Sequence, residues 1–149
     1  ANRWLNAIAV AKTRQKQALT EVSANVDLGA ATARLRTLMA DGRVQSANEI
    51  ATQLLGNSAL ADNVELLAIR AEARLVMRDG QGAAEDWARV LGLEPGRARA
   101  LRGLGDAYSL LGDAVRARYY YQEYLLRAAS VREERAYIVA VRRRLEELK

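Results

Sequence analysis

Apolar residues recur along most of the chain at spacings of three and four, which is the period of one face of an α-helix. No alternation of apolar and polar residues lasts beyond four residues, so the pattern predicts helices and no strand. The expected helices cover about residues 2–24, 28–40, 43–55, 63–78, 82–92, 96–111, 113–128 and 131–148. The chain is therefore predicted to be all-α.

Turn and capping signals separate these helices. Asp41–Gly42 and Leu111–Asp113 are typical of turns between helices. Asp79–Gly82 is a third turn signal, with two glycines available for a positive φ. Asp62–Glu65 and Ser130–Glu133 have the spacing of a capping box, so each is expected to open a helix.

The sequence repeats itself with a period of 34 residues, and windows 64–97 and 98–131 align on five identities. These pairs are Leu67 with Leu101, Ala73 with Ala107, Asp79 with Asp113, Ala83 with Ala117, and Leu91 with Leu125. Trp87 falls on Tyr121 in the same alignment. A weaker copy starts near Leu28 and keeps Leu35, Leu38, Gly42, Ala47 and Leu54 in frame.

The second window carries Leu101-x2-Leu104-Gly105-x2-Tyr108, followed by Ala117-x3-Tyr121. This pattern resembles the tetratricopeptide repeat (TPR), whose signature is W-x2-L-G-x2-Y…A-x3-F…P over 34 residues. Ala129 stands in place of the closing proline. The first window keeps Pro95 but departs at Arg70 and Arg74, where Leu and Tyr are usual. We expect these arginine stems to lie in the groove between helices, with their charged heads in water.

The resemblance implies a right-handed superhelix of antiparallel helix pairs, a TPR-like α-solenoid, with N- and C-terminal flanking helices. Residues 1–149 are expected to form a single domain. Its parts are an N-terminal helix at 1–26, repeats at 28–62, 64–97 and 98–130, and a C-terminal capping helix at 131–149. Two placements stay open for residues 1–24: against the first repeat, or as the trailing helix of a missing upstream repeat.

The aromatic residues are assigned mainly to packing. Trp87 is expected in the core, and Tyr121 and Tyr124 at packing positions of one helix. Adjacent residues on a helix point about 100° apart, so either Tyr119 or Tyr120 is expected to be partly exposed. Trp4 is expected to make a capping contact, with a partner contact as the alternative.

The composition excludes most catalytic chemistry. The sequence has no Cys and no His, which removes thiol nucleophiles, thiolate metal sites and the usual general base. The pairs Glu133–Glu134 and Glu146–Glu147 point apart on a helix and cannot form an acid/base dyad. Neither a calcium-binding loop nor a phosphate-binding glycine motif is present. We therefore expect no enzyme, no catalytic residue, no metal and no cofactor.

The charge is basic, with 23 Lys and Arg against 18 Asp and Glu, giving +5. The run Arg142–Arg144 is the best nucleic-acid candidate, but it lies among glutamates without stacking aromatics, so a solvated surface is preferred. No stretch reaches the roughly 18 apolar residues that span a membrane. The preference for Arg over Lys, together with abundant Ala, indicates a bacterial source. The absence of Cys fits the cytoplasm and the periplasm or cell envelope equally.

In TPR proteins the first helix of each repeat, helix A, usually lines a concave face. Carried onto this sequence, the resemblance implies a partner-binding groove with a mixed charged and apolar lining. Its residues are Arg36, Met39, Ile69, Glu72, Leu75, Val76, Arg99, Arg102, Asp106 and Ser109. Such a groove suits a peptide with apolar anchors and at least one carboxylate.

One TPR subfamily captures peptide C-termini with a carboxylate clamp. The corresponding positions here are Thr32, Arg36, Ile69, Arg99 and Gly103. Only Arg99 keeps the charge that the clamp requires, so a clamp is not expected.

The expected function is a non-catalytic protein–protein interaction module. It would act as a scaffold, adaptor or chaperone-like protein, with a bacterial envelope or secretion assembly as the proposed setting. The first alternative is a self-assembling TPR protein that forms a dimer or oligomer through its terminal helices. An arginine-driven nucleic-acid binder ranks below both.

Overall fold

The computed structural model describes the backbone of residues 2–148 and their side chains outside residues 17–26. Helices and turns account for the regular structure in this part of the chain, and no strand occurs there, which confirms the all-α prediction. The chain divides into two units, Ala1–Arg34 and Leu35–Lys149. The limits of the predicted repeats stay a prediction.

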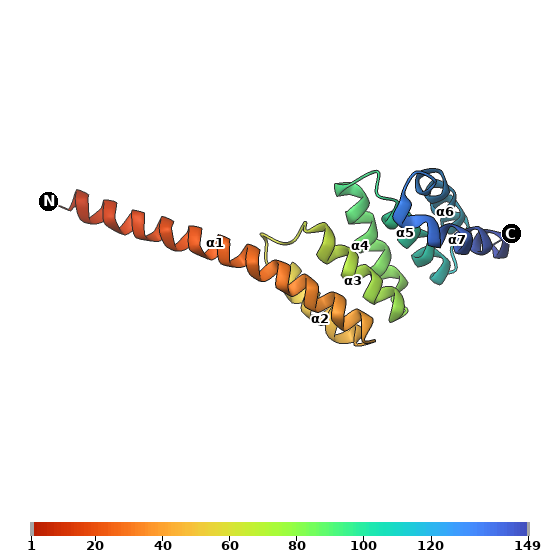
Figure 1. Cartoon of the computed structure of the whole chain (residues 1–149), viewed down its shortest axis with the longest axis horizontal. Coiled ribbons are helices and arrows are strands. Elements are labelled where there is room, and N and C mark those ends of the chain that lie inside the picture. The colour runs from red at the N-terminus through yellow and green to blue at the C-terminus, as the bar shows by residue number, and fades with distance from the viewer. Residues whose placement is uncertain (1, 149) are drawn as a thin grey trace. The chain divides into compact units, whose positions relative to one another are not determined.

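The elements are helices that follow one another along the chain, joined by turns (Figure 1). They are α1 (Arg3–Ala40), α2 (Val44–Leu55), α3 (Val64–Val76), α4 (Gly80–Leu93), α5 (Ala98–Leu110), α6 (Ala114–Ala128), the 3₁₀ turn η1 (Arg132–Glu134) and α7 (Arg135–Glu147). From residue 43 onward the predicted limits lie close to these. The last prediction differs at its start, because a separate 3₁₀ turn precedes α7.

The first unit is helical, and the predicted break between residues 24 and 28 is wrong. Helix α1 runs without interruption from Arg3 to Ala40. Residues 25–27 are Asn, Val and Asp, which lower helix propensity by fractions of a kcal/mol but do not stop a helix as Pro does. Trp4 is 64% exposed, and the capping contact expected of it stays a prediction. None of the described helices is long and apolar enough to cross a membrane.

In the second unit, each helix packs on the next one along the chain. Helix α3 pairs with α4 and α5 with α6, while α2 packs on α3, α4 on α5 and α6 on α7. We call the end of α1 (residues 35–40), α3, α5 and α7 the A helices, and α2, α4 and α6 the B helices. Helix α7 follows the last B helix and thus takes the place of a further A helix.

Each turn from an A helix to a B helix contains one residue with a left-handed backbone. Gly42 has φ 77° and Gly112 has φ 78°, as expected for glycine in these turns. In the turn between α3 and α4 the corresponding residue is Arg78, with φ 63°. The expectation of a positive φ at Gly80 or Gly82 is therefore wrong, since both lie inside α4.

Close packing explains Gly80 instead. A Cβ at this residue would lie 2.9 Å from Cγ of Leu111, so only glycine lets the first turn of α4 approach α5 this closely. Asp79 precedes it as the N-cap of α4 and accepts a hydrogen bond from the Gly82 N–H at 2.9 Å. Asp113 caps α6 in the same way, since its carboxylate accepts a hydrogen bond from the N–H of Arg116.

Both predicted capping boxes are wrong in detail. Helix α3 is capped by Asn63, whose Oδ1 accepts a hydrogen bond from the Leu66 N–H at 3.0 Å. Asp62, one residue earlier, pairs instead with the guanidinium of Arg89. At the other box, the Ser130 hydroxyl donates to a carbonyl in the preceding turn, and η1 begins without a side-chain cap.

Three aromatic residues fill the core, as predicted. Trp87 is 1% exposed, and Tyr121 and Tyr124 are fully buried. Two glycines of α5 make room for them. A Cβ at Gly103 would overlap the Trp87 ring, and a Cβ at Gly105 would overlap the Tyr121 ring.

Of the two remaining tyrosines of α6, Tyr119 lies at the surface, which confirms that one of the pair is exposed. Tyr119 is 57% exposed and makes an edge contact with the half-buried Tyr120. Tyr120 stacks on Tyr108 of α5, with ring centroids 5.6 Å apart and planes inclined by 7°.

Arg70 and Arg74 do not hold their heads in water. Arg70 Nε and Nη2 donate to the two carboxylate oxygens of Asp86 at 2.8 and 2.7 Å. Arg74 Nη1 donates to Asp86 Oδ2 at 2.9 Å. Asp86 is only 3% exposed, and its buried carboxylate requires these cations as partners. The prediction for the two arginines is therefore wrong, because their partner lies on the facing helix.

Candidate functional site

Ion pairs join successive A helices along the face that these helices share, which we call the A-helix face. Arg36 near the end of α1 lies 2.8 Å from Glu65 of α3. Glu72 of α3 accepts a hydrogen bond from Arg99 Nε of α5 at 2.9 Å. Arg102 of α5 in turn donates to Glu134 of η1 at 3.1 Å. Charged residues of the predicted groove thus form ion pairs between helices.

Glu65 is the acidic centre of this face. Arg36, Arg97 and Arg99 lie 2.8, 3.6 and 3.8 Å from its carboxylate oxygens. Burial alone would raise the pKa of Glu65, but the hydrogen bond from Arg36 and the charges of the three arginines outweigh it and lower the pKa. Glu65 was not among the predicted residues, although it lies 34 residues before Arg99.

Arg102 contacts both Glu134 and Tyr137. Its guanidinium carbon lies 3.8 Å from the centroid of the Tyr137 ring, and its side chain is 16% exposed. Its partner Glu134 is buried and also accepts a hydrogen bond from the Tyr124 hydroxyl at 2.7 Å. Burial, followed by the hydrogen bond to Glu134, raises the pKa of Tyr124. Arg102 therefore secures η1 and α7, and it is not a free cation.

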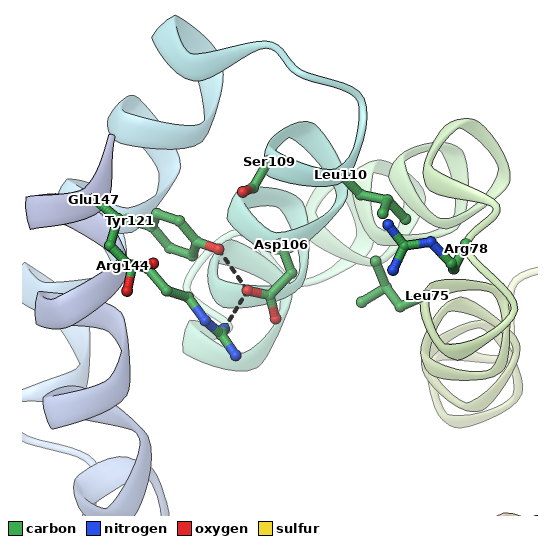
Figure 2. A pocket seen from close by; sticks show the side chains of 8 residues that line it. All are labelled: Leu75, Arg78, Asp106, Ser109, Leu110, Tyr121, Arg144 and Glu147. Atoms are coloured by element: carbon green, nitrogen blue, oxygen red, sulfur yellow. Dashed lines mark hydrogen bonds and ion pairs between the residues drawn. The ribbon is translucent and has the colours of Figure 1, made fainter. Parts of the chain in front are cut away.

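A pocket of about 450 Å³ opens where the C-terminal parts of α3, α5 and α7 meet (Figure 2). Its lining combines two leucines with polar and charged side chains. The lining residues are Leu75, Arg78, Asp106, Ser109, Leu110, Tyr121, Arg144 and Glu147. Of the predicted groove residues, three belong to it: Leu75, Asp106 and Ser109.

Asp106 organises the wall of the pocket. Its Oδ1 accepts a hydrogen bond from the Tyr121 hydroxyl at 2.6 Å and pairs with Arg144 Nη1 (Figure 2). Burial and the nearby carboxylate of Asp106 raise the pKa of Tyr121, so the phenol stays protonated as a donor. This network joins α5, α6 and α7, and it fixes the shape of the pocket.

The predicted groove residues fall into distinct groups. Ion pairs between A helices engage Arg36, Glu72, Arg99 and Asp106, and Arg102 pairs with Glu134 of η1. Val76 is 63% exposed, and Met39 is half-buried. Ile69 is 2% exposed and belongs to the core, so its side chain is not available to a partner.

Sequence reasoning missed the contributions of η1 and α7. Glu134, Tyr137, Arg144 and Glu147 lie on the A-helix face or in the pocket, but residues 131–149 were treated only as a cap. One signal was available, because the buried Val141 lies 34 residues after the buried Ala107. The segment could have been recognised as a further A helix.

The charges of this face are arranged in arginine–carboxylate pairs. In the described part of the chain, no three acidic side chains gather as they would around a metal ion. The wall of the pocket offers a hydroxyl at Ser109, apolar carbons at Leu75 and Leu110, and the guanidinium of Arg78, which forms no ion pair with any residue that the structure describes. These groups can bind a ligand through apolar contact, hydrogen bonds and charge.

No protein-family model matches the sequence, and no curated protein matches it either. Among solved structures, the chain is similar to the type III secretion translocator chaperone SycD of Yersinia enterocolitica. The TM-score is 0.74 at 12% identity, over 81% of this chain and 82% of that chain. It is also similar to PcrH of Pseudomonas aeruginosa in complex with the chaperone binding region of PopD. Here the TM-score is 0.73 at 15% identity, over 81% and 90% of the two chains.

A third similar structure is the second TPR domain of human RPAP3 in complex with an HSP70 peptide. The TM-score is 0.63 at 20% identity, over 75% of this chain and 92% of that chain. These likenesses show the fold, which is a TPR-like helical solenoid. They confirm the architecture expected from the 34-residue repeat.

Proposed function

We propose that the chain is a non-catalytic protein-binding module, and that its A-helix face receives a segment of a partner protein. The observation that carries this proposal is the pocket of about 450 Å³ between the ends of α3, α5 and α7. It opens on the face where the ion pairs already join neighbouring A helices. These ion pairs hold the A helices together and leave the pocket open to a partner.

The lining of the pocket favours a peptide as its ligand over a small reactive substrate. Leu75 and Leu110 offer an apolar surface, while Ser109 is exposed and can exchange hydrogen bonds with a peptide backbone. The absence of His and Cys from the sequence supports a non-catalytic role. The SycD and PcrH likenesses support an adaptor or chaperone in a bacterial secretion assembly as the setting.

Selection from a displayed library of random peptides, followed by binding assays, tests the proposal. Leu75→Arg places a long charged side chain in the pocket, and we expect it to abolish binding of the selected peptides. The matched control is Leu126→Arg, because Leu126 lies on α6 outside the pocket and is 76% exposed. Equal loss in both variants, or selected peptides that bind Leu75→Arg as well as wild type, would overturn the proposal.

A second candidate function is self-association through the first unit. Its described residues include four apolar side chains that are at least 43% exposed: Trp4, Leu5, Ile8 and Val10. Such exposure on one short stretch favours contact with another chain. Sedimentation velocity over a concentration series tests this candidate, which predicts an oligomer that Trp4→Ala with Ile8→Ala converts to monomer. A monomeric wild type at every concentration would exclude it.

A further inference from the structure

The turn between α3 and α4 contains an arginine where the other two A-to-B turns contain glycine. Gly42 and Gly112 have φ 77° and 78°, and Arg78 has φ 63°. A side chain with a Cβ is disfavoured in this left-handed conformation, and glycine is the residue that adopts it freely. Arg78 is therefore a locally unfavourable choice for its turn, and such residues concentrate at binding sites.

The side chain of Arg78 faces the pocket without a partner of its own. Its guanidinium lies at the pocket beside Leu75 and Leu110 (Figure 2). Among the described residues, it forms no hydrogen bond and no ion pair through this side chain. Arg144, the other arginine of the pocket, is paired with Asp106. Arg78 is thus the cation of the pocket that remains available to a ligand.

The charges around Arg78 define what it can bind. Asp106 lines the pocket, but its carboxylate is already engaged by Tyr121 and Arg144. Glu147 lies on the α7 side of the pocket, away from the turn that carries Arg78 (Figure 2). A ligand carboxylate is therefore favoured at Arg78 and disfavoured at the α7 side, where Glu147 would repel it.

We propose that Arg78 is a ligand-binding residue, and that the pocket takes a peptide segment with an apolar side chain beside an acidic one. The apolar side chain packs on Leu75 and Leu110, and the carboxylate accepts hydrogen bonds from the Arg78 guanidinium. This inference rests on the proposed function and adds the chemistry of the partner. The net charge of +5 also favours the approach of acidic segments.

Fluorescence anisotropy with three labelled, terminally blocked peptides tests the inference. The peptides share a Leu-Leu core followed by Glu, Gln or Lys, and they are titrated with the full chain. The variants are Arg78→Gly, which relieves the turn, and Arg78→Lys, which keeps the charge. Arg43→Gly is the matched control, because it removes the same charge from an exposed arginine beside Gly42 in the corresponding turn.

We expect wild type and Arg43→Gly to bind the Glu peptide more tightly than the Gln peptide, and the Lys peptide least. Arg78→Gly should bind the Glu peptide about tenfold more weakly than wild type does, the usual loss for a charged hydrogen-bond partner. Its affinity for the Gln peptide should be unchanged, and Arg78→Lys should lie between. Because Arg78→Gly relieves a strained turn, its melting temperature should not fall, so weaker binding cannot be assigned to unfolding.

Equal binding of the Glu and Gln peptides by wild type would overturn the inference. Equal binding of the Glu peptide by wild type and Arg78→Gly would also overturn it. In both cases the proposed function stands if library-selected peptides still lose binding in Leu75→Arg. If no selected peptide binds at the pocket at all, the proposed function fails and this inference fails with it.

Discussion

Arg74 donates a hydrogen bond to the buried Asp86 at 2.9 Å, at positions that Tyr108 and Tyr120 occupy one repeat later. In the later repeat, the two tyrosine rings stack with centroids 5.6 Å apart. Two neighbouring helix pairs of the same fold are therefore held together by different kinds of interaction. The earlier pair uses a desolvated ion cluster, and the later pair uses aromatic stacking.

Removing Asp86 tests the ion cluster. Asp86→Ala leaves Arg70 and Arg74 partly buried without their carboxylate, so we expect a loss of about 3–5 kcal/mol in the free energy of unfolding. Urea unfolding followed by circular dichroism measures it. The neighbouring Glu85→Ala is the control, because Glu85 is exposed and should change stability by less than about 0.5 kcal/mol. Similar values for both variants would contradict the account.

Aromatic stacking should also be able to join the two helices of the earlier repeat. Replacing all three charges at once, as Arg70→Leu, Arg74→Tyr and Asp86→Tyr, installs the residues found 34 positions later. We expect stability within about 2 kcal/mol of wild type, since apolar groups of suitable shape can replace a buried ion cluster. Differential scanning calorimetry would detect a failure, which is a triple variant as unstable as Asp86→Ala alone.

Glycine at residue 103 is required by Trp87. In Gly103→Ala the new methyl group would overlap the buried indole ring, and we expect a cost of about 1–3 kcal/mol. Gly92→Ala is the matched control, because a Cβ there meets nothing within 4 Å. That substitution should stabilise α4 by up to about 1 kcal/mol. Thermal unfolding of both variants should therefore shift in opposite directions, and shifts in the same direction would contradict this packing.

Helix α2 lacks the cap that its counterparts have. Its N-cap is Arg43, which makes no capping hydrogen bond, while Asp79 and Asp113 cap α4 and α6. Arg43→Asp should supply the missing acceptor and stabilise the chain by about 1 kcal/mol in urea unfolding. Arg43→Ala separates the cap from the loss of charge. A gain equal in both variants would show that the cap is not its cause.

Glu65 should make stability depend on pH. Its arginine neighbours lower its pKa in the folded chain, so its contribution is present at neutral pH and is lost as the pH falls through that lowered pKa. We expect Glu65→Gln to cost about 1 kcal/mol or less at neutral pH, because Arg36 is well exposed. The cost should vanish at an acidic pH that lies well below this lowered pKa, where the carboxyl group is protonated. A cost that is the same at both pH values would contradict the lowered pKa.

The repeat architecture could be predicted because a 34-residue spacing sets both helix lengths and packing positions. It placed Trp87 and Tyr121 in the core correctly. The same spacing could not reveal that Arg70 and Arg74 meet Asp86, because that contact depends on how two helices face each other. The break predicted between residues 24 and 28 is absent from α1, because the residues there lower helix propensity without stopping a helix as Pro does.

The candidate site was only partly predictable. Leu75, Asp106 and Ser109, which their position in the repeat assigned to the groove, line the pocket. Ile69 was assigned to the groove as well, but it corresponds to Gly103, which packs against Trp87, and both positions are buried. Arg78 falls on Gly112 in the 34-residue register, but only the left-handed backbone at Arg78 shows that this departure from glycine is unfavourable in the turn.

Chemical-shift mapping tests the protein-binding claim most directly. The isotope-labelled full chain would be titrated with a library-selected peptide, and backbone amide shifts would be followed residue by residue. We expect the largest shifts around the pocket, at Leu75, Ser109 and Leu110 and along the α7 side near Arg144. Shifts confined to the B helices, or to the exposed apolar residues near Trp4, would contradict binding at the A-helix face.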